Sequence, residues 1–183
     1  NRAIFFPAGG GQPGDVGRLT WDGGEMRVAT TVKGEGGGAV LVPAAGDATP
    51  PVGAEVRQEL DEATRLAHMK MHTGLHLLSV VIPLPVTGGQ IGAEKSRLDF
   101  DMPDAPEDKD AIEAALNALI EADLPVGYQW ITDAELDANP GLVKTLRVQP
   151  PRGSGRVRLV RIGEGDAQID LQPCGGTHVR STG

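Results

Sequence analysis

The chain has 183 residues, a formal net charge of −8 and 39% hydrophobic residues, which indicates a folded globular protein and excludes a disordered tail or a fibre. Its single cysteine excludes an internal disulfide and favours a reducing, cytoplasmic compartment. No apolar run approaches the roughly 20 residues of a membrane-spanning helix, so we expect no membrane partner. Three Phe, two Trp and one Tyr argue against a base-stacking sheet of the RNP type. The negative charge argues against a general polyanion binder and against DNA as a partner.

The first third of the chain has the pattern of short strands joined by glycine-rich turns. Residues 18–21 and 25–33 flank Asp22-Gly-Gly24, which is a hairpin signal, and a further apolar run follows a glycine cluster. Short strands at this spacing predict a small N-terminal β-barrel. We therefore expect one domain over residues 1–60 and a second over residues 61–183.

The second part of the chain mixes helices with strands, which predicts an α+β domain. Residues 59–78 contain a single glycine and no proline, and their apolar residues recur at helical spacing. Acidic residues followed by an apolar face predict a second helix over residues 106–123. The other expected elements are strands at 97–100, 126–131, 156–162 and 168–171 and a short helix at 133–139.

Two residue pairs have the spacing of metal ligands. One pair lies four residues apart on a single face of the first predicted helix, and the other encloses glycines that allow a tight backbone path. Thiolate plus imidazole is a typical Zn²⁺ donor set, and the two pairs together predict a zinc site, although surface or capping histidines explain most lone pairs of this kind. The four candidate ligands are His72, His76, Cys174 and His178. Thr73 occupies the place of the glutamate base of a zincin protease. His68 is a candidate third ligand on the helix, although we expect it to pack or to face solvent one turn away.

The glycine-rich segment Gly9–Gly14 matches the pattern GxGxxG without its structural context. A dinucleotide-binding fingerprint needs a helix directly after it, whereas Pro13 and a hairpin follow here. Two interpretations remain. The segment is either a loop whose backbone approaches a ligand, with Gln12 and Asp15 as its polar groups, or a glycine bulge between strands.

Basic residues cluster in one window of this acidic chain. Residues 144–161 contain six Lys and Arg side chains and no Asp or Glu. A basic stripe beside a metal site fits a phosphate backbone, whereas a solvated strand face gives the same pattern. On the first interpretation, Arg152, Arg156 and Arg158 contact the nucleic acid.

Four segments together resemble the editing domain of alanyl-tRNA synthetase. His72–Leu78 reads HTGLHLL and resembles the motif HTAxHLL, and Cys174–His178 reads CGGTH and resembles CxGTH. Phe6–Asp15 resembles the stretch FYPxGGGQPxD, and Arg97–Phe100 resembles an RFDF-like strand. The order and approximate spacing of all four segments agree with the family. Because no catalytic synthetase core accompanies them, we expect the free-standing AlaX type.

The resemblance implies a small N-terminal β-barrel followed by an α+β editing domain of the alanyl/threonyl-tRNA synthetase type. It also implies a trans-editing activity, the hydrolysis of the ester that joins a wrong amino acid, serine and sometimes glycine, to alanine tRNA. By position, the zinc-site residues are His72, His76, Cys174 and His178. The residues expected to bind substrate are Gly10, Gly11, Asp15, Arg97 and Thr177, with Gln12 as the catalytic candidate and Arg152, Arg156 and Arg158 on the tRNA.

Two mechanisms and two rival functions follow from this resemblance. In the first mechanism zinc is catalytic: it polarises the ester carbonyl or lowers the pKa of its bound water to about 7. In the second, zinc only holds the terminal ribose, and Gln12 and the N–H groups of Gly10 and Gly11 place the water. An editing domain of the threonyl-tRNA synthetase type is disfavoured by the glycine loop and the expected barrel. A non-catalytic, zinc-containing RNA-binding module is the other alternative, because zinc sites with four protein ligands are usually structural.

Overall fold

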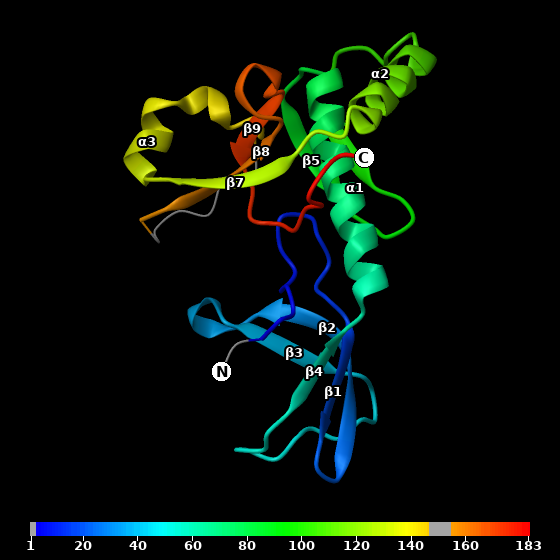
Figure 1. The fold of residues 1–183 in the computed structure, drawn as a ribbon, viewed down its shortest axis with the longest axis vertical. Helices are drawn as coiled ribbons and strands as arrows, with labels where there is room; N and C mark the ends of the chain where they lie inside the picture. The colour runs from blue at the N-terminus through cyan, green and yellow to red at the C-terminus, as the bar shows by residue number, and fades with distance from the viewer. Residues whose placement is uncertain (1–2, 147–154) are drawn as a thin grey trace.

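The computed structural model describes residues 3–146 and 155–183. Two β-rich parts are joined by one long helix, α1 (Glu62–Val81), which rises from the lower sheet in Figure 1 into an upper part built of strands and two further helices. All pairings between named strands are antiparallel. The chain is therefore of mixed α and β structure, as predicted. Within the described ranges, no helix combines the length and the apolarity needed to cross a membrane.

The lower sheet contains four strands in the order β3-β2-β1-β4. The strands are β1 (Gly17–Trp21), β2 (Gly24–Lys33), β3 (Ala39–Pro43) and β4 (Arg57–Leu60), with a short 3₁₀ turn η1 (Glu35–Gly37) between β2 and β3. The predicted hairpin joins β1 to β2, where Trp21 pairs with Gly24 across a two-residue turn. The core of this sheet is formed by Phe5, Leu19, Met26 and Val28.

The expected barrel is not closed by the described strands. The outer strands β3 and β4 are not paired with each other, so the sheet is open. Closing a barrel requires strand tilt and stagger that bring the two edges into register. Here β4 has only four residues, and the connection before it contains Pro50 and Pro51, which cannot donate to a strand ladder.

Helix α1 begins directly after β4. The carboxylate of Asp61 caps it by accepting a hydrogen bond from the Thr64 N–H at 2.9 Å. The prediction started this helix too early because residues 57–60 pair with β1 as an additional strand. Histidines four residues apart remain on one helix face, as the spacing requires.

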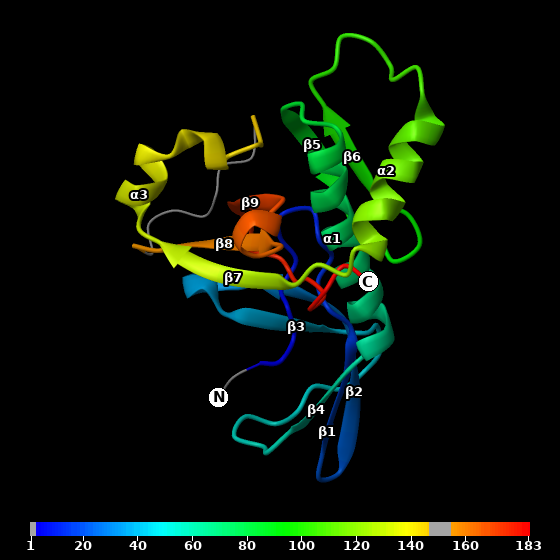
Figure 2. The ribbon, with the colours of Figure 1, turned by 45° about the horizontal axis from the view of Figure 1, so that its top comes forward.

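The upper part is arranged around α1, with β9 on one side of the helix and α2 on the other (Figure 2). One sheet pairs β5 (Val86–Gln90) with β6 (Arg97–Phe100), and a second has the order β7-β8-β9. The remaining elements are α2 (Lys109–Glu121), β7 (Val126–Ile131), α3 (Asp133–Ala138), η2 (Pro140–Leu142), β8 (Val157–Ile162), η3 (Gly165–Ala167) and β9 (Asp170–Pro173). Leu136 of α3 packs on Val157 and Leu159, so α3 covers one face of the second sheet.

The C-terminal segment after β9 is clamped to the start of β7. The Val126 N–H donates to Arg180 O at 2.8 Å, and the Thr182 N–H donates to Leu124 O at 3.0 Å. The Thr182 hydroxyl also donates to Leu119 O, at the end of α2, at 2.9 Å. These bonds fix the far end of the segment that carries Cys174 and His178.

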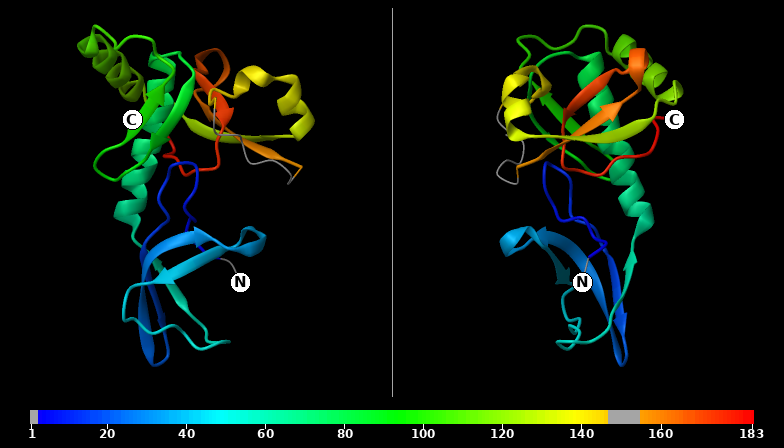
Figure 3. Two further views of the ribbon diagram at one scale, coloured as in Figure 1. Left: turned by 180° about the vertical axis from the view of Figure 1, so that it is seen from behind. Right: turned by 60° about the vertical axis from the view of Figure 1, so that its left-hand side comes forward.

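The glycine loop, residues 6–15, extends from the lower sheet toward the upper part (Figure 3). Its base is held by Asp15, which is 1% exposed and accepts hydrogen bonds from the Phe6 N–H and from Arg65 of α1. Its tip is held by the Ile91 N–H, which donates to Gly11 O at 2.9 Å. The loop is therefore fixed at both ends, as expected of a segment that lines a binding site.

Arg65→Ala should lower the free energy of unfolding by roughly 3 kcal/mol, because the buried Asp15 carboxylate would lose its ionic partner. Urea denaturation measures this change. The control is Arg18→Ala, which removes an exposed ion pair with Glu59 and should leave the urea midpoint nearly unchanged. Equal midpoints for the two variants would contradict the anchoring role of Arg65.

Candidate metal centre

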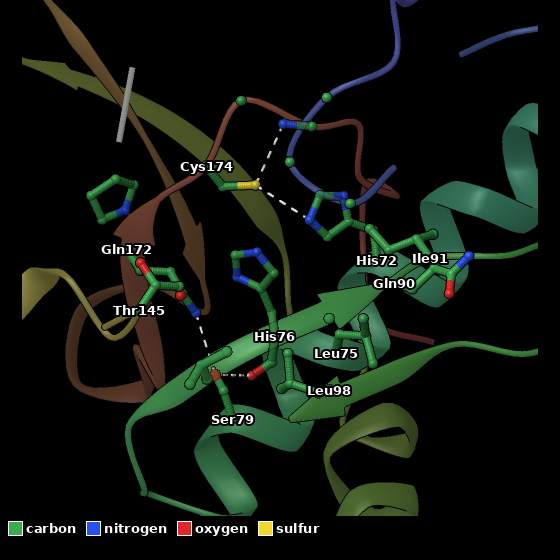
Figure 4. A pocket seen from close by; sticks show the side chains of 18 of the residues that line it. His72, Leu75, His76, Ser79, Gln90, Ile91, Leu98, Thr145, Gln172 and Cys174 are labelled. Carbon is green, nitrogen blue, oxygen red and sulfur yellow. Dashed lines mark hydrogen bonds between the residues drawn. The ribbon is translucent and has the colours of Figure 1, made fainter. Parts of the chain in front are cut away.

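Four side chains that could hold a metal ion meet between α1 and the C-terminal segment. His72 and His76 lie on one face of α1, and Cys174 and His178 follow β9. Their ligand atoms all lie within 4.8 Å of one another. Cys174 Sγ is 3.4 Å from Nε2 of both His72 and His178, close to the roughly 3.5 Å that separates sulfur and nitrogen ligands of one tetrahedral Zn²⁺. Figure 4 shows Cys174, His72 and His76 turned toward one another. The donor set and its spacing fit a transition-metal ion.

Each imidazole has a hydrogen-bonding partner on its Nδ1 atom, contributed by a different element. The pairs are His72 with Gln12 Oε1 at 3.0 Å, His76 with Asp170 Oδ2 at 2.9 Å and His178 with Thr73 Oγ1 at 3.1 Å. The Thr177 N–H donates to Gln12 Oε1, so this oxygen is an acceptor and His72 carries its proton on Nδ1. The Asp170 carboxylate likewise accepts a hydrogen bond from Nδ1 of His76. The Nε2 atoms are left directed at one point, as in histidine metal sites.

Burial and hydrogen bonding set the protonation of the ligands. Burial raises the pKa of the Cys174 thiol, but the three neighbouring imidazoles, with His178 first, outweigh it and hold this pKa well below its ordinary value. Burial lowers the pKa of His178 to about 4. These directions favour a thiolate and a neutral imidazole, the forms that bind metal. Burial also lowers the pKa of His76, but Asp170 and Cys174 outweigh it and raise this pKa to about 9, so an incoming ion displaces a proton here.

The Cys174–His178 segment bends tightly around the ring of His72. A Cβ atom at Gly176 would overlap the His72 imidazole and lie 2.8 Å from Gln12 Oε1, so this position requires glycine. Arg158 of β8 holds the bend, because its Nε donates to Cys174 O at 2.9 Å and its Nη2 donates to Gly176 O. Arg158 thus fixes the backbone at Cys174 itself and at Gly176, two residues further on, and thereby the position of the Cys174 side chain.

A buried carboxylate connects the ligand cluster to its surroundings. Asp170 is 3% exposed and accepts hydrogen bonds from His76, from Lys144 Nζ at 2.6 Å and from Gln172 Nε2 at 2.8 Å. The Ser79 hydroxyl donates to His76 O and accepts from Gln172. Burial raises the pKa of Asp170, but its hydrogen bonds, with His76 first, hold the pKa below its ordinary value. Asp170 therefore stays ionised and keeps the His76 ring in place.

A cavity of about 670 Å³ opens beside the cluster. Small-molecule sites have volumes of roughly 300–1,000 Å³. His72, His76 and Cys174 line this cavity together with the glycine loop, β5 and β9 (Figure 4), whereas His178 is not part of its wall. A metal held by the four ligands would therefore lie at the cavity wall, within reach of a bound molecule.

The residues predicted to bind substrate differ in their distance from this cavity. Gly10 and Gly11 line it, with φ angles of 61° and 82°. Asp15 lies in the buried ion pair under the loop, and Arg97 is an exposed residue of β6 whose Nε is 2.9 Å from the Asp99 carboxylate. Neither Asp15 nor Arg97 is part of the cavity wall. The structure thus places Asp15 where it fixes the loop.

Gln12, predicted to place a water molecule, is 2% exposed and does not line the cavity. Its Oε1 accepts from His72 and from the Thr177 N–H, and its Nε2 donates to Thr177 Oγ1 at 2.7 Å. Both amide atoms are therefore engaged within the protein. In this geometry the Gln12 amide contacts His72 and Thr177, and its role in placing a water molecule stays a prediction.

The predicted nucleic-acid contacts are also separated by the structure. Arg152 lies outside the described residues, and Arg156 is exposed just before β8. Arg158 is half-buried, donates to two carbonyls of the metal-binding segment and lies 4.6 Å from the ring centroid of Tyr128. Arg158 thus supports the metal centre, a role that the alternating basic pattern does not reveal.

Sequence reasoning missed the polar network behind the ligands. Asp170 and Gln172 occupy alternate positions of β9 and so share the face of Cys174, a signal that was present in the sequence. Lys144, by contrast, gave no signal beyond its charge. His68 is 5% exposed and is not part of the cluster, so of the alternatives for this residue the structure favours packing over a ligand role or exposure to solvent.

Comparison with known proteins assigns the chain to a family. Residues 157–183 match the family described as threonyl and alanyl tRNA synthetase second additional domain. The whole chain is 35% identical to the alanyl-tRNA editing protein AlaX-M of Methanosarcina acetivorans and covers 77% of that protein. The chain belongs to the alanyl-tRNA editing family. This confirms the resemblance inferred from the four sequence motifs.

Longer members of the family contain the same region. The chain is 34% identical to the alanyl-tRNA editing protein AlaX-L of Pyrococcus horikoshii and covers 44% of it. It is 38% identical to the alanine–tRNA ligase of Pyrobaculum arsenaticum, of which it covers 21%. The chain thus spans about a fifth of the length of the alanine–tRNA ligases that it matches.

The purified protein should retain one divalent metal ion per chain, and Cys174→Ala should lower this content, because the thiolate is the softest ligand. Elemental analysis after dialysis measures the content. His68→Gln is the matched control, since it changes a buried histidine of the same helix outside the cluster, and it should leave the content unchanged. Full occupancy in a Cys174→Ala, His178→Ala double variant would disprove the ligand assignment.

Proposed function

We propose that the protein is a zinc-dependent deacylase that hydrolyses the ester between alanine tRNA and a wrong amino acid, serine foremost and sometimes glycine. One observation carries this proposal. A metal-ligand cluster opens onto a cavity in a chain that matches alanyl-tRNA editing proteins over its full length. The substrate is accordingly a tRNA whose 3′ end enters this cavity.

The donor set favours zinc over other divalent ions. Three imidazoles and one thiolate suit Zn²⁺, whereas Mg²⁺ and Ca²⁺ prefer oxygen ligands. When bound, zinc can polarise the ester carbonyl or lower the pKa of a bound water to about 7. The partners on the Nδ1 atoms support a preformed site, because each ring is already held in its orientation.

The glycine loop supplies a wall of backbone for the reacting ester. Gly9 and Gln12 close a tight turn through reciprocal backbone hydrogen bonds of 3.0 and 3.1 Å. Gly10 and Gly11, at the apex of this turn, line the cavity, where backbone N–H groups can stabilise an oxyanion. A Cβ atom at Gly11 would lie 3.1 Å from Gly89 O, so the close packing of loop and β5 also favours glycine there.

The remaining walls of the cavity suit the end of a nucleic acid. Leu75, Val86, Ile91 and Leu98 provide apolar surface that excludes water from the ester. Lys33 lines the cavity beside Gly9, and its ammonium group suits a phosphate of the tRNA.

The rival function is a non-catalytic zinc-containing RNA-binding module. Four protein ligands around one ion favour it, because closed zinc sites are usually structural. The position of three of the four ligands at the cavity wall favours catalysis instead. An editing domain of the threonyl type is disfavoured because the whole of this chain matches part of an alanine–tRNA ligase and most of an alanyl-tRNA editing protein.

The zinc-loaded protein should release serine from alanine tRNA that has been mischarged with serine, and it should leave correctly charged alanyl-tRNA intact. Gln12→Ala should lower kcat/KM for the serine ester by roughly 10- to 100-fold together with metal affinity, because His72 loses its orienting partner. Release of labelled amino acid and a metal titration measure the two effects. Arg18→Ala, at an exposed position of the lower sheet outside the cavity, is the control and should retain activity. Binding of tRNA without any hydrolysis by the zinc-loaded protein would favour the non-catalytic module.

A further inference from the structure

Two aromatic side chains lie exposed on the outer strand of the metal-site sheet. Tyr128 and Trp130 of β7 are 50% and 60% exposed, although aromatic residues make up only 3% of the chain. One residue separates them, so both side chains leave the strand on the same face.

The register of the sheet places both rings on the face of the metal centre. Trp130 pairs with Arg158, and the Cys174 N–H donates to Arg158 O at 3.1 Å, so these three residues form one row across the sheet. Neighbouring residues of such a row project from one face. Because adjacent strands lie about 4.8 Å apart, Trp130 is about 10 Å from Cys174.

The second row connects Tyr128 to the cavity wall. Tyr128 pairs with Val160, and Val160 pairs with Gln172, which lines the cavity. The guanidinium of Arg158 lies 4.6 Å from the Tyr128 ring centroid, so one side of this ring is held by a cation. The half-exposed ring is thus held in place by Arg158, two strands away from the cavity residue Gln172.

Helix α1 covers this face of the sheet over β9 and leaves β7 uncovered. Asp170 and Gln172 of β9 contact His76 and Ser79 of α1. Tyr128 and Trp130, two strands away, remain accessible. The face therefore continues from the metal ligands outward onto an aromatic surface.

We propose that Tyr128 and Trp130 stack against the unpaired bases at the 3′ end of the tRNA while its ester lies at the metal centre. This proposal rests on the proposed function. Unpaired bases stack on aromatic side chains without sequence preference, whereas paired bases are already stacked. The distance of about 10 Å from Cys174 matches roughly three stacked nucleotides at 3.4 Å each, the length of the CCA end.

Tryptophan fluorescence tests the stacking directly, without hydrolysis. Trp21 and Trp130 are the two tryptophans of the chain, so Trp21→Phe leaves Trp130 as the reporter. Titration of this metal-loaded variant with a single-stranded oligonucleotide ending in CCA should quench its fluorescence, and a blunt RNA duplex of equal length should not. An absence of quenching by the oligonucleotide at saturating concentration overturns the proposal.

Kinetics separate base stacking from a structural role of the rings. Trp130→Ala and Tyr128→Ala should each raise KM for the serine ester by roughly 5- to 100-fold with kcat nearly unchanged. Trp130→Phe and Tyr128→Phe retain a ring and should largely restore KM. Val40→Ala, at an exposed apolar residue of β3 in the other sheet, is the control. Unchanged KM in both alanine variants overturns the proposal.

The outcomes distinguish this proposal from the proposed function. If the wild-type protein hydrolyses the ester and neither ring affects KM, the stacking surface is wrong and the deacylase stands. If CCA quenches Trp130 but no ester is hydrolysed, the stacking surface stands and the deacylase is wrong. A dimer in size-exclusion chromatography that Trp130→Ala dissociates assigns the rings to self-association and overturns the proposal.

Discussion

The structure depends on one constraint, the convergence of three buried imidazoles whose second nitrogens all need partners. Buried polar groups are almost always hydrogen-bonded, and a metal-binding histidine needs its Nδ1 held so that Nε2 faces the ion. Gln12 of the glycine loop, Thr73 of α1 and Asp170 of β9 meet this need, each from a different element. The loop, the helix and the sheet are therefore fixed relative to one another by a single small cluster, and the cavity is the space that they leave.

The four candidate ligands could be predicted from their local spacing in the sequence. Their hydrogen-bonding partners lie far away in the sequence and could be identified only from the fold. His72 and His76 share a helix face because four residues make about one turn, and glycines let Cys174 and His178 converge. The partners are remote in sequence, since Gln12 lies 60 residues from His72 and Asp170 lies 94 residues from His76. Gln12 was consequently expected to face the substrate, although its amide is fully used inside the protein. The four-residue strand β4 was also missed, because a strand that short carries too few residues to show alternation.

Composition and charge patterns describe how many residues of a kind are present and leave their placement open. The small number of aromatic residues argues against a base-stacking sheet, but it does not show that two of them lie exposed on the sheet of the candidate metal centre. The basic residues of the segment 144–161 give a second example, because their pattern in the sequence does not show where each side chain points. Arg158 belongs to it by sequence, yet its guanidinium turns inward to the carbonyls of the Cys174–His178 segment. A side chain with five donors is suited to this task, because one guanidinium can satisfy two carbonyls and still stack on a ring.

The clamp at Thr182 limits how far the candidate ligands could separate if a bound ion left. The segment with Cys174 and His178 is tied at one end to β9 and at the other to the start of β7. Only a short arc of chain lies between these two ties, so rebinding of an ion would not require the protein to refold.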